Sequence, residues 1–293
     1  MEKQRNRAVT MGVAMLAAAL TTLALAGSAS AFSELYKKFQ YCPYKTEGIT
    51  RCVQAVTEGG EVDLGSKNVS IVNDVTLQGG YGPPVESFSK LTAPTNGITL
   101  SKTGQPVPGG LTGIVPSEKS PWLVKALIKF FFDNSLTQVN SVLELAGSVN
   151  LSEFNLRQKT GVAMKMPVKV KLENPFLGKA CYVGSDKAPI QWELTAATTS
   201  PPKPNSPITG HTGKIELLDG GRILKLVENK LVENAWAAPS ASGCGGLLGF
   251  LVNPIVNSTS GLPSAAGNNS AILENTIHIA SAAAVKKDNE LNP

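Results

Sequence analysis

Two histidines are the residues that could act as a base in nucleophilic chemistry in this chain. A Ser-His-Asp triad needs one histidine, and the chain offers His211 and His278. His211 lies in a stretch rich in Pro and Gly, which is typical of a solvated loop. His278 alternates with Ile277 and Ile279, which predicts an outward-facing position on a strand. Neither setting is typical of a catalytic base, and the Gly-x-Ser-x-Gly motif of many hydrolases does not occur.

Paired carboxylates are the chemistry that the sequence leaves open. Glycosidases place two acidic side chains about 5 to 10 Å apart across a cleft. Glu193 and Glu216 lie on predicted strands, where each occupies the polar phase. A solvated surface position is the simpler interpretation. A secreted hydrolase acting on glycans therefore stays an alternative, and it requires two carboxylates that converge in a cleft.

Metal, phosphate and polyanion sites are not indicated by any motif. The sequence lacks His-Glu-x-x-His, Cys-x-x-Cys and an acidic calcium loop, so we expect no metal and no cofactor. Lys165, Lys169 and Lys171 form a basic stripe without interleaved aromatic residues, which favours a solvated face. The chain has 27 basic and 22 acidic residues. The first 31 residues contain three of the basic residues and one acidic residue, which leaves +3 for the remainder, too little to imply a nucleic-acid partner.

The first 31 residues have the organisation of a cleavable secretory signal peptide. Three basic residues precede an uncharged apolar stretch from Met11 to Leu25, and Ala29-Ser30-Ala31 supplies a small-x-small cleavage pattern. The apolar stretch is shorter than the roughly 20 residues of a membrane-spanning helix. We therefore expect cleavage before Phe32 and a mature domain, residues 32–293, that is extracellular or associated with the cell envelope.

The four cysteines all lie in the expected mature part. An even number in an exported chain predicts two disulfides, although three pairings are possible. Cys42 and Cys52 would close a short loop that contains Pro43 and Gly48. The favoured pairing is therefore Cys42–Cys52, which leaves Cys181–Cys244.

Strand patterns dominate the chain and predict a mainly β fold, an antiparallel β-sandwich or barrel-like single domain. Apolar residues alternate with polar ones in several segments. The segment from Lys214 to Val227 contains Asp219-Gly220-Gly221, a strong hairpin signal. The alternating segments lie near residues 69–71, 75–77, 143–151, 165–173, 190–194 and 273–280.

Two segments depart from the strand pattern. Ser120-Pro121 begins a predicted amphipathic helix over about 120–133, and a second helix is expected around Gly246 to Val252. Residues 198–213 are expected to form a Pro-rich surface loop. The apolar face of the first helix either packs on the core or forms a contact surface, and its large side chains are Trp122, Leu123, Leu127, Phe130 and Phe131.

Several blocks are similar to uncharacterised exported proteins of high-GC actinobacteria. The resemblance implies an exported protein and transfers no catalytic residue. The blocks are Leu77-Gln78-Gly79-Gly80, Pro106-Val107-Pro108-Gly109-Gly110, Asn174-Pro175-Phe176-Leu177-Gly178, Ser242-Gly243-Cys244-Gly245-Gly246 and Gly261-Leu262-Pro263-Ser264-Ala265-Ala266-Gly267.

The favoured function is an exported, non-catalytic structural or binding protein of the cell surface or extracellular space. One alternative is a carrier of apolar or lipid ligands in which the 121–132 helix covers a cavity. Its discriminating feature would be a large apolar pocket beneath that helix. The candidate partners are a cell-envelope component, a lipid or an apolar ligand.

Overall fold

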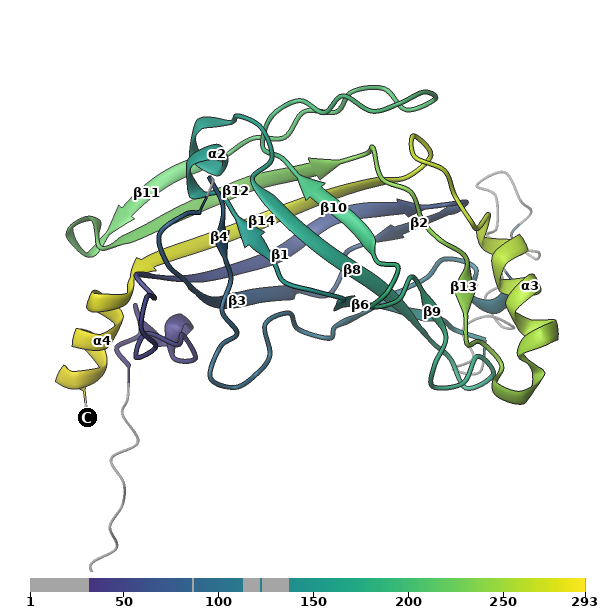
Figure 1. Cartoon of the computed structure of the whole chain (residues 1–293), viewed down its shortest axis with the longest axis horizontal. Coiled ribbons are helices and arrows are strands. Elements are labelled where there is room, and N and C mark those ends of the chain that lie inside the picture. The colour runs from purple at the N-terminus through teal and green to yellow at the C-terminus, as the bar shows by residue number, and fades with distance from the viewer. Residues whose placement is uncertain (1–31, 86, 113–121, 123–136, 293) are drawn as a thin grey trace, which may run out of the picture.

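Two antiparallel β-sheets lie face to face in the computed structural model, which describes residues 32–85, 87–112, 122 and 137–292 (Figure 1). The expected mainly β, disulfide-linked fold is confirmed. The first sheet, in spatial order, contains β11 (Lys214–Leu218), β12 (Ile223–Glu233), β14 (Ser270–Ser281), β1 (Arg51–Leu64) and β2 (Lys67–Ser70), and β3 (Val75–Tyr81) also pairs with β1.

The second sheet is built around one long strand, β8 (Met164–Glu173). Its spatial order is β13 (Ala241–Ser242), β9 (Tyr182–Val183), β8, β6 (Asn140–Leu145) and β5 (Gly104–Pro106). The remaining strands of this sheet are β10 (Ile190–Leu194) and β7 (Asn150–Leu151), which pair with β8, and β4 (Ser89–Lys90), which pairs with β7.

Alternating side chains place the hydrophobic core between the sheets. On β8, Met164, Met166, Val168 and Val170 are buried, and Lys165, Lys169 and Lys171 point outward. Trp192 on β10 is buried in the same way. These residues share one cluster with apolar side chains of β1, β12 and β14. The period-2 pattern therefore explains why these segments form strands with one buried face.

The longest strand, β1, changes its inward phase along its length. Thr57 pairs with Asn275 and Gly59 with Glu274 of β14, so Glu58 is an extra residue in a β-bulge. Before the bulge odd-numbered side chains such as Ala55 face the core, and after it the even-numbered Val62 does. A bulge of one residue reverses the facing of all that follows.

Both expected disulfides are present. Cys42 and Cys52 have Cα atoms 5.7 Å apart, and Cys181 and Cys244 have Cα atoms 4.1 Å apart. Cys181 directly precedes β9, and Cys244 follows β13 after Gly243. The second disulfide therefore joins two paired strands at the edge of the second sheet.

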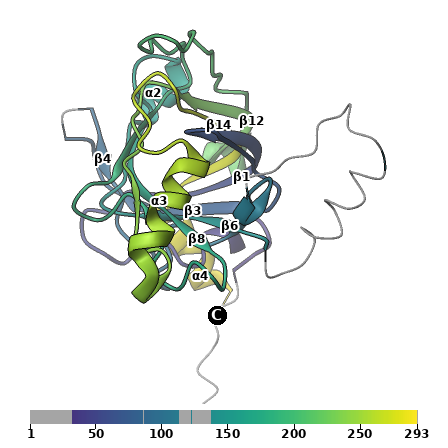
Figure 2. The same ribbon diagram turned by 90° about the vertical axis from the view of Figure 1, so that its right-hand side faces the viewer.

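Two of the described helices lie at opposite ends of the sheets. Helix α4 (Ala282–Leu291) continues β14, and α3 (Gly249–Ser260) lies at the opposite end of the long axis, whereas α2 (Glu153–Gln158) is a short helix after β7 (Figures 1 and 2). Ser33 binds Asp288 of α4, with its backbone N–H 3.0 Å and its hydroxyl 2.7 Å from the carboxylate oxygens. The start of the described chain is therefore held against α4. Within the described residues, short 3-10 turns lie at Lys37–Phe39, Gly110–Thr112, Asp219–Gly221 and Gly246–Leu248.

Of the two expected helices, the one at 246–252 falls within the described residues. The signal peptide and the 120–133 helix lie outside the described residues, except for Trp122, whose side chain is 78% exposed. The expected helix at 246–252 is a 3-10 turn followed by α3, which extends to Ser260 despite Pro254. Among the described residues no helix is long and apolar enough to span a membrane.

Candidate ligand-binding cavity

An apolar cavity of about 140 Å³ lies between the two sheets. The first sheet contributes Ala55, Val62, Leu77 and Leu273, and the second contributes Leu143, Met166, Val170 and Trp192. Val256 and Leu262, in and just after α3, line one end. An engineered apolar cavity of about 150 Å³ in another protein binds benzene or xenon, so this volume is large enough for part of an apolar ligand.

Most polar side chains that line the cavity are bonded to the protein itself. Thr57 donates to the Asn275 carbonyl oxygen at 2.8 Å, and Asn275 donates to Asn229 at 3.2 Å. The side-chain oxygen Oε1 of Gln105 accepts hydrogen bonds from the backbone N–H groups of Val72 and Asn73. A polar group that is already bonded offers little to a ligand, so these residues leave the interior effectively apolar.

Besides the Ser260 hydroxyl, two groups that line the cavity are exceptions. The Lys67 ammonium group has no ion-pair or hydrogen-bond partner among the described residues, and burial lowers its pKa. The indole N–H of Trp192 is buried and has no hydrogen-bond acceptor within the described structure. Both groups are hydrogen-bond donors, which gives the cavity a chemical preference for acceptors.

Helix α3 is attached to the second sheet by asparagine side chains. Asn257 accepts the backbone N–H of Ala241 at 2.7 Å and donates to its carbonyl oxygen at 3.0 Å. Asn253 accepts the backbone N–H of Cys244 at 2.9 Å. These bonds fix the face of α3 that borders the cavity.

The other face of α3 and the turn before it are apolar and exposed. Their large side chains are Leu247, Leu248, Phe250, Leu251 and Ile255. No charged residue occurs between Glu233 and Glu274. Contiguous apolar groups on a surface mark contact sites more often than scattered ones do. We call this set the α3 surface.

The structure does not bring Glu193 and Glu216 together as a catalytic pair. Glu193 on β10 lies 3.0 Å from Lys165, and Glu216 on β11 lies 3.0 Å from Lys225. Each carboxylate is thus neutralised by a lysine of its own sheet, and neither lines the cavity. A glycosidase site built on these two residues has no support in this geometry.

A third carboxylate was not anticipated. Glu233 at the end of β12 is buried and accepts the backbone N–H of Ala235 at 2.6 Å. Burial raises its pKa, and the charge of Glu193 adds to the rise. Glu233 does not line the cavity, and its bond to the adjacent backbone indicates a structural role in the turn that follows β12.

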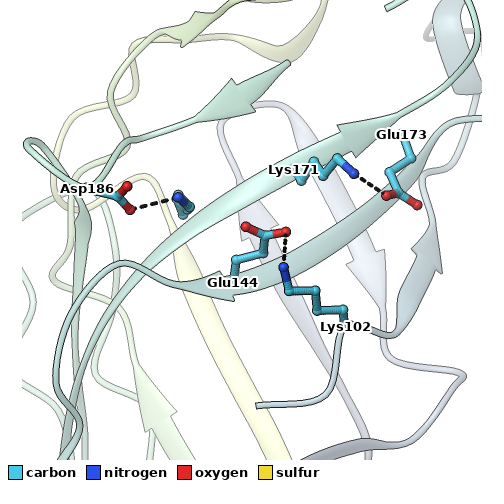
Figure 3. Close-up of polar contacts among 6 residues, drawn as sticks. Lys102, Glu144, Lys171, Glu173 and Asp186 are labelled. Atoms are coloured by element: carbon cyan, nitrogen blue, oxygen red, sulfur yellow. Dashed lines mark hydrogen bonds and ion pairs between the residues drawn. The ribbon is translucent and has the colours of Figure 1, made fainter. Parts of the chain in front are cut away.

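The lysine stripe of β8 is paired with carboxylates on the outer face of the second sheet. Lys169 lies 2.7 Å from Asp186, and Lys171 lies 2.7 Å from Glu173. Figure 3 shows Lys171 directed at Glu173. It also shows Lys102, in the loop before β5, directed at Glu144 on the neighbouring strand β6. Because each lysine has a carboxylate partner, the stripe presents little free positive charge.

His278 differs from the sequence-based expectation. It occupies the outer face of the first sheet as predicted, but the segment after Phe32 covers it, and its side chain is buried. The Lys38 ammonium group donates to its Nε2 at 2.9 Å. Burial, with the charges of Lys38 and Lys225, lowers the histidine pKa to about 4. His211 is exposed in the 198–213 loop, where its backbone pairs with Lys230.

The expected apolar contact surface has one described member. Trp122 is exposed, and Leu123, Leu127, Phe130 and Phe131 lie outside the described residues. Gly110, Leu111 and Val139, which adjoin that stretch of chain, line the cavity. In the described part of the chain, no three His, Cys, Asp or Glu side chains gather as metal ligands would.

The fold and the cavity together define a β-rich, disulfide-linked protein with an apolar interior site. No family model, curated protein or solved structure matches the chain. The cavity and the α3 surface are therefore the features of the molecule that bear on its function.

Proposed function

We propose that the protein is an exported, non-catalytic binding protein that holds an apolar ligand in the cavity between its sheets. The observation that supports this proposal is the cavity of about 140 Å³ with its largely apolar lining. Burying apolar area contributes about 25 cal/mol per Å², so an alkyl or aromatic group would gain affinity there. The ligand class is therefore the apolar or lipid class expected for a carrier. The feature that supports it is the cavity between the sheets and not the 121–132 helix.

Export is part of the same proposal. Two disulfides are consistent with an extracellular protein, because such bonds persist in oxidising compartments. The resemblance to exported actinobacterial proteins is in agreement. Protein recovered from the culture medium or the envelope of its host should begin at Phe32, as determined by N-terminal sequencing. An intact N-terminus, with the protein confined to the cytoplasm, would contradict export.

Binding is tested with N-phenyl-1-naphthylamine, a neutral fluorescent probe for apolar sites. Saturable binding with one site is expected. Leu143→Trp fills part of the cavity and should reduce affinity for the probe at least tenfold, while Leu217→Trp, at a strongly exposed position of β11, should not. A second cavity variant, Val75→Phe, serves if Leu143→Trp does not fold. Absence of saturable binding, or unchanged affinity in a folded cavity variant, would refute the proposal.

A second candidate function is exchange of the ligand with a lipid surface. The observation that favours it is the α3 surface, because α3 lines the cavity with one face and exposes uncharged apolar side chains on the other. Amphipathic helices insert such faces into the membrane interface. The absence of charge on this segment favours a contact that is hydrophobic rather than electrostatic.

The exchange function is tested with vesicles of zwitterionic phosphatidylcholine. Phe250→Ser removes a 73% exposed ring from the α3 surface, and Phe154→Ser removes a 69% exposed ring from α2. Burial of one such side chain is worth about 2 kcal/mol. Flotation with vesicles should therefore fall more than tenfold for Phe250→Ser and stay unchanged for Phe154→Ser. Equal behaviour of the two variants would rule out α3 as the lipid contact.

A further inference from the structure

Lys67 occupies an inward position on an otherwise ordinary edge strand. Asn68 and Ser70 of β2 are exposed, whereas Lys67 and Val69 are half-buried and line the cavity. The partner of Lys67 across the hairpin is the buried Leu64. The lysine therefore lies on the inward face of the strand, where strand alternation places apolar side chains.

The hairpin before Lys67 is held against the C-terminal end of α3. The backbone N–H of Ser66 donates to the Ser260 carbonyl oxygen at 2.9 Å. Gly65 has φ +62°, and a Cβ there would lie 2.1 Å from the same oxygen, so only glycine permits this approach. Lys67 is consequently placed where the first sheet meets α3, at the end of the cavity that Val256 and Leu262 line.

The ammonium group of Lys67 lacks a counter-ion in the described structure. The lysines of β8 differ, because each has a carboxylate within 3.0 Å. Burial without a partner is unfavourable for a charge, and burial alone lowers the Lys67 pKa. An ammonium group without a counter-ion is available to bind an anion. The four-carbon stem of the lysine can lie along an apolar wall.

Two unbonded groups of residues that line the cavity can only donate hydrogen bonds. Lys67 supplies ammonium donors, and the buried indole N–H of Trp192 is a further donor without an acceptor in the described residues. No Asp or Glu side chain is among the residues that line the cavity. The site thus complements a ligand that carries acceptor oxygens and negative charge on an apolar body.

We propose that the ligand is an amphipathic anion whose head group pairs with Lys67 and whose hydrocarbon part occupies the cavity. This inference rests on the proposed function and specifies its ligand class. Carboxylate and phosphate head groups share the required chemistry. A free inorganic anion does not, because it would leave the apolar volume empty.

The test compares ligands that share one alkyl chain. Octanoate and octyl phosphate carry the negative head group, 1-octanol lacks the charge, and inorganic phosphate lacks the chain. Each is titrated as a competitor of N-phenyl-1-naphthylamine at neutral pH. One charge-assisted hydrogen bond is worth about tenfold in affinity, so at least one of the charged alkyl ligands should bind about ten times more tightly than 1-octanol, and inorganic phosphate should not compete.

The matched variants are Lys67→Gln and Lys165→Gln. Lys67→Gln keeps most of the side-chain length and should remove the preference for the charged ligands, while binding of 1-octanol and the neutral probe stays the same. Lys165→Gln removes a half-exposed lysine that is paired with Glu193 and should retain the preference.

Two results separate the inference from the function on which it rests. Equal affinity for charged and uncharged ligands in the unmodified protein, or a preference that survives in Lys67→Gln, would overturn the role of Lys67 but leave apolar binding intact. Failure of the neutral probe and 1-octanol to bind at all would overturn the proposed function itself.

Discussion

Asn229 and Asn275 lie side by side on β12 and β14, both buried, and the Asn275 amide donates to the Asn229 carbonyl oxygen at 3.2 Å. Asn229 in turn donates to the backbone carbonyl oxygens of His211 and Thr212, at 3.1 and 3.3 Å. On the other side, the Thr57 hydroxyl donates to Asn275. This polar ladder crosses three strands at the place where β1 and β12 both change register against β14.

The ladder should contribute measurably to stability. Asn275→Ala leaves the Thr57 hydroxyl and the Asn229 carbonyl oxygen without their partner, which should lower the free energy of unfolding by about 2 kcal/mol. Asn68→Ala is the control, because Asn68 is exposed and bonds to Glu61 and Asp63 at the surface. Its cost should stay below about 0.5 kcal/mol. Urea denaturation measures both values, and equal costs would contradict the structural role of the ladder.

His278 should make the stability depend on pH. Its folded-state pKa is about 4, below the value of about 6.5 for an unfolded chain. The unfolded state therefore binds more protons between these values, and stability should fall by about 3 kcal/mol as the pH drops from 6.5 to 4. His278→Gln should flatten this dependence, and His211→Gln, at an exposed position, should not. A profile that His278→Gln leaves unchanged would assign the effect to other groups.

The two disulfides should stabilise the fold unequally. Their cysteines are separated by 63 residues in Cys181–Cys244 and by 10 in Cys42–Cys52. In the chain-entropy model, replacing the longer pair with alanines costs about 4 kcal/mol and the shorter pair about 3 kcal/mol. Thermal denaturation of the two double variants provides the comparison. A larger loss for the shorter pair would show that packing, rather than chain entropy, determines the order.

Adjacent residues of α3 should respond oppositely to a new charge. Val256 is 9% exposed and borders the cavity, whereas Ile255 is 58% exposed on the α3 surface. Val256→Asp buries an unpaired carboxylate and should cost more than about 3 kcal/mol. Ile255→Asp should change stability by no more than about 0.5 kcal/mol. Comparable melting temperatures for the two variants would mean that α3 is not packed as described.

Strand alternation predicted the elements in which one phase is kept throughout. β8 and β10 bury every second side chain, and β14 buries its odd-numbered side chains from Ala271 to Ile279. β1 was not predicted, although it lies at the centre of its sheet. Its two glycines, Gly59 and Gly60, and the bulge at Glu58 interrupt the alternation, so a search for one continuous phase finds no strand there.

The cavity could not be predicted, because it depends on how the two sheets are separated. Lys67 did carry a signal: it shares its phase with Val69 and Ile71, and a lysine in an apolar phase is unusual. The burial of His278 carried none, because the residues that cover it, such as Lys38, are some 240 positions away in the chain. Local patterns determine which face a side chain occupies but not what covers that face.

The contact between Ser33 and Asp288 has a practical consequence for orientation. It holds the beginning of the described chain and α4 at one end of the long axis, and α3 lies at the other end (Figure 1). A linker joined near either residue would therefore immobilise the protein on a sensor chip with α3 directed away from the support. Ligands and vesicles could then reach that end without steric interference from the attachment.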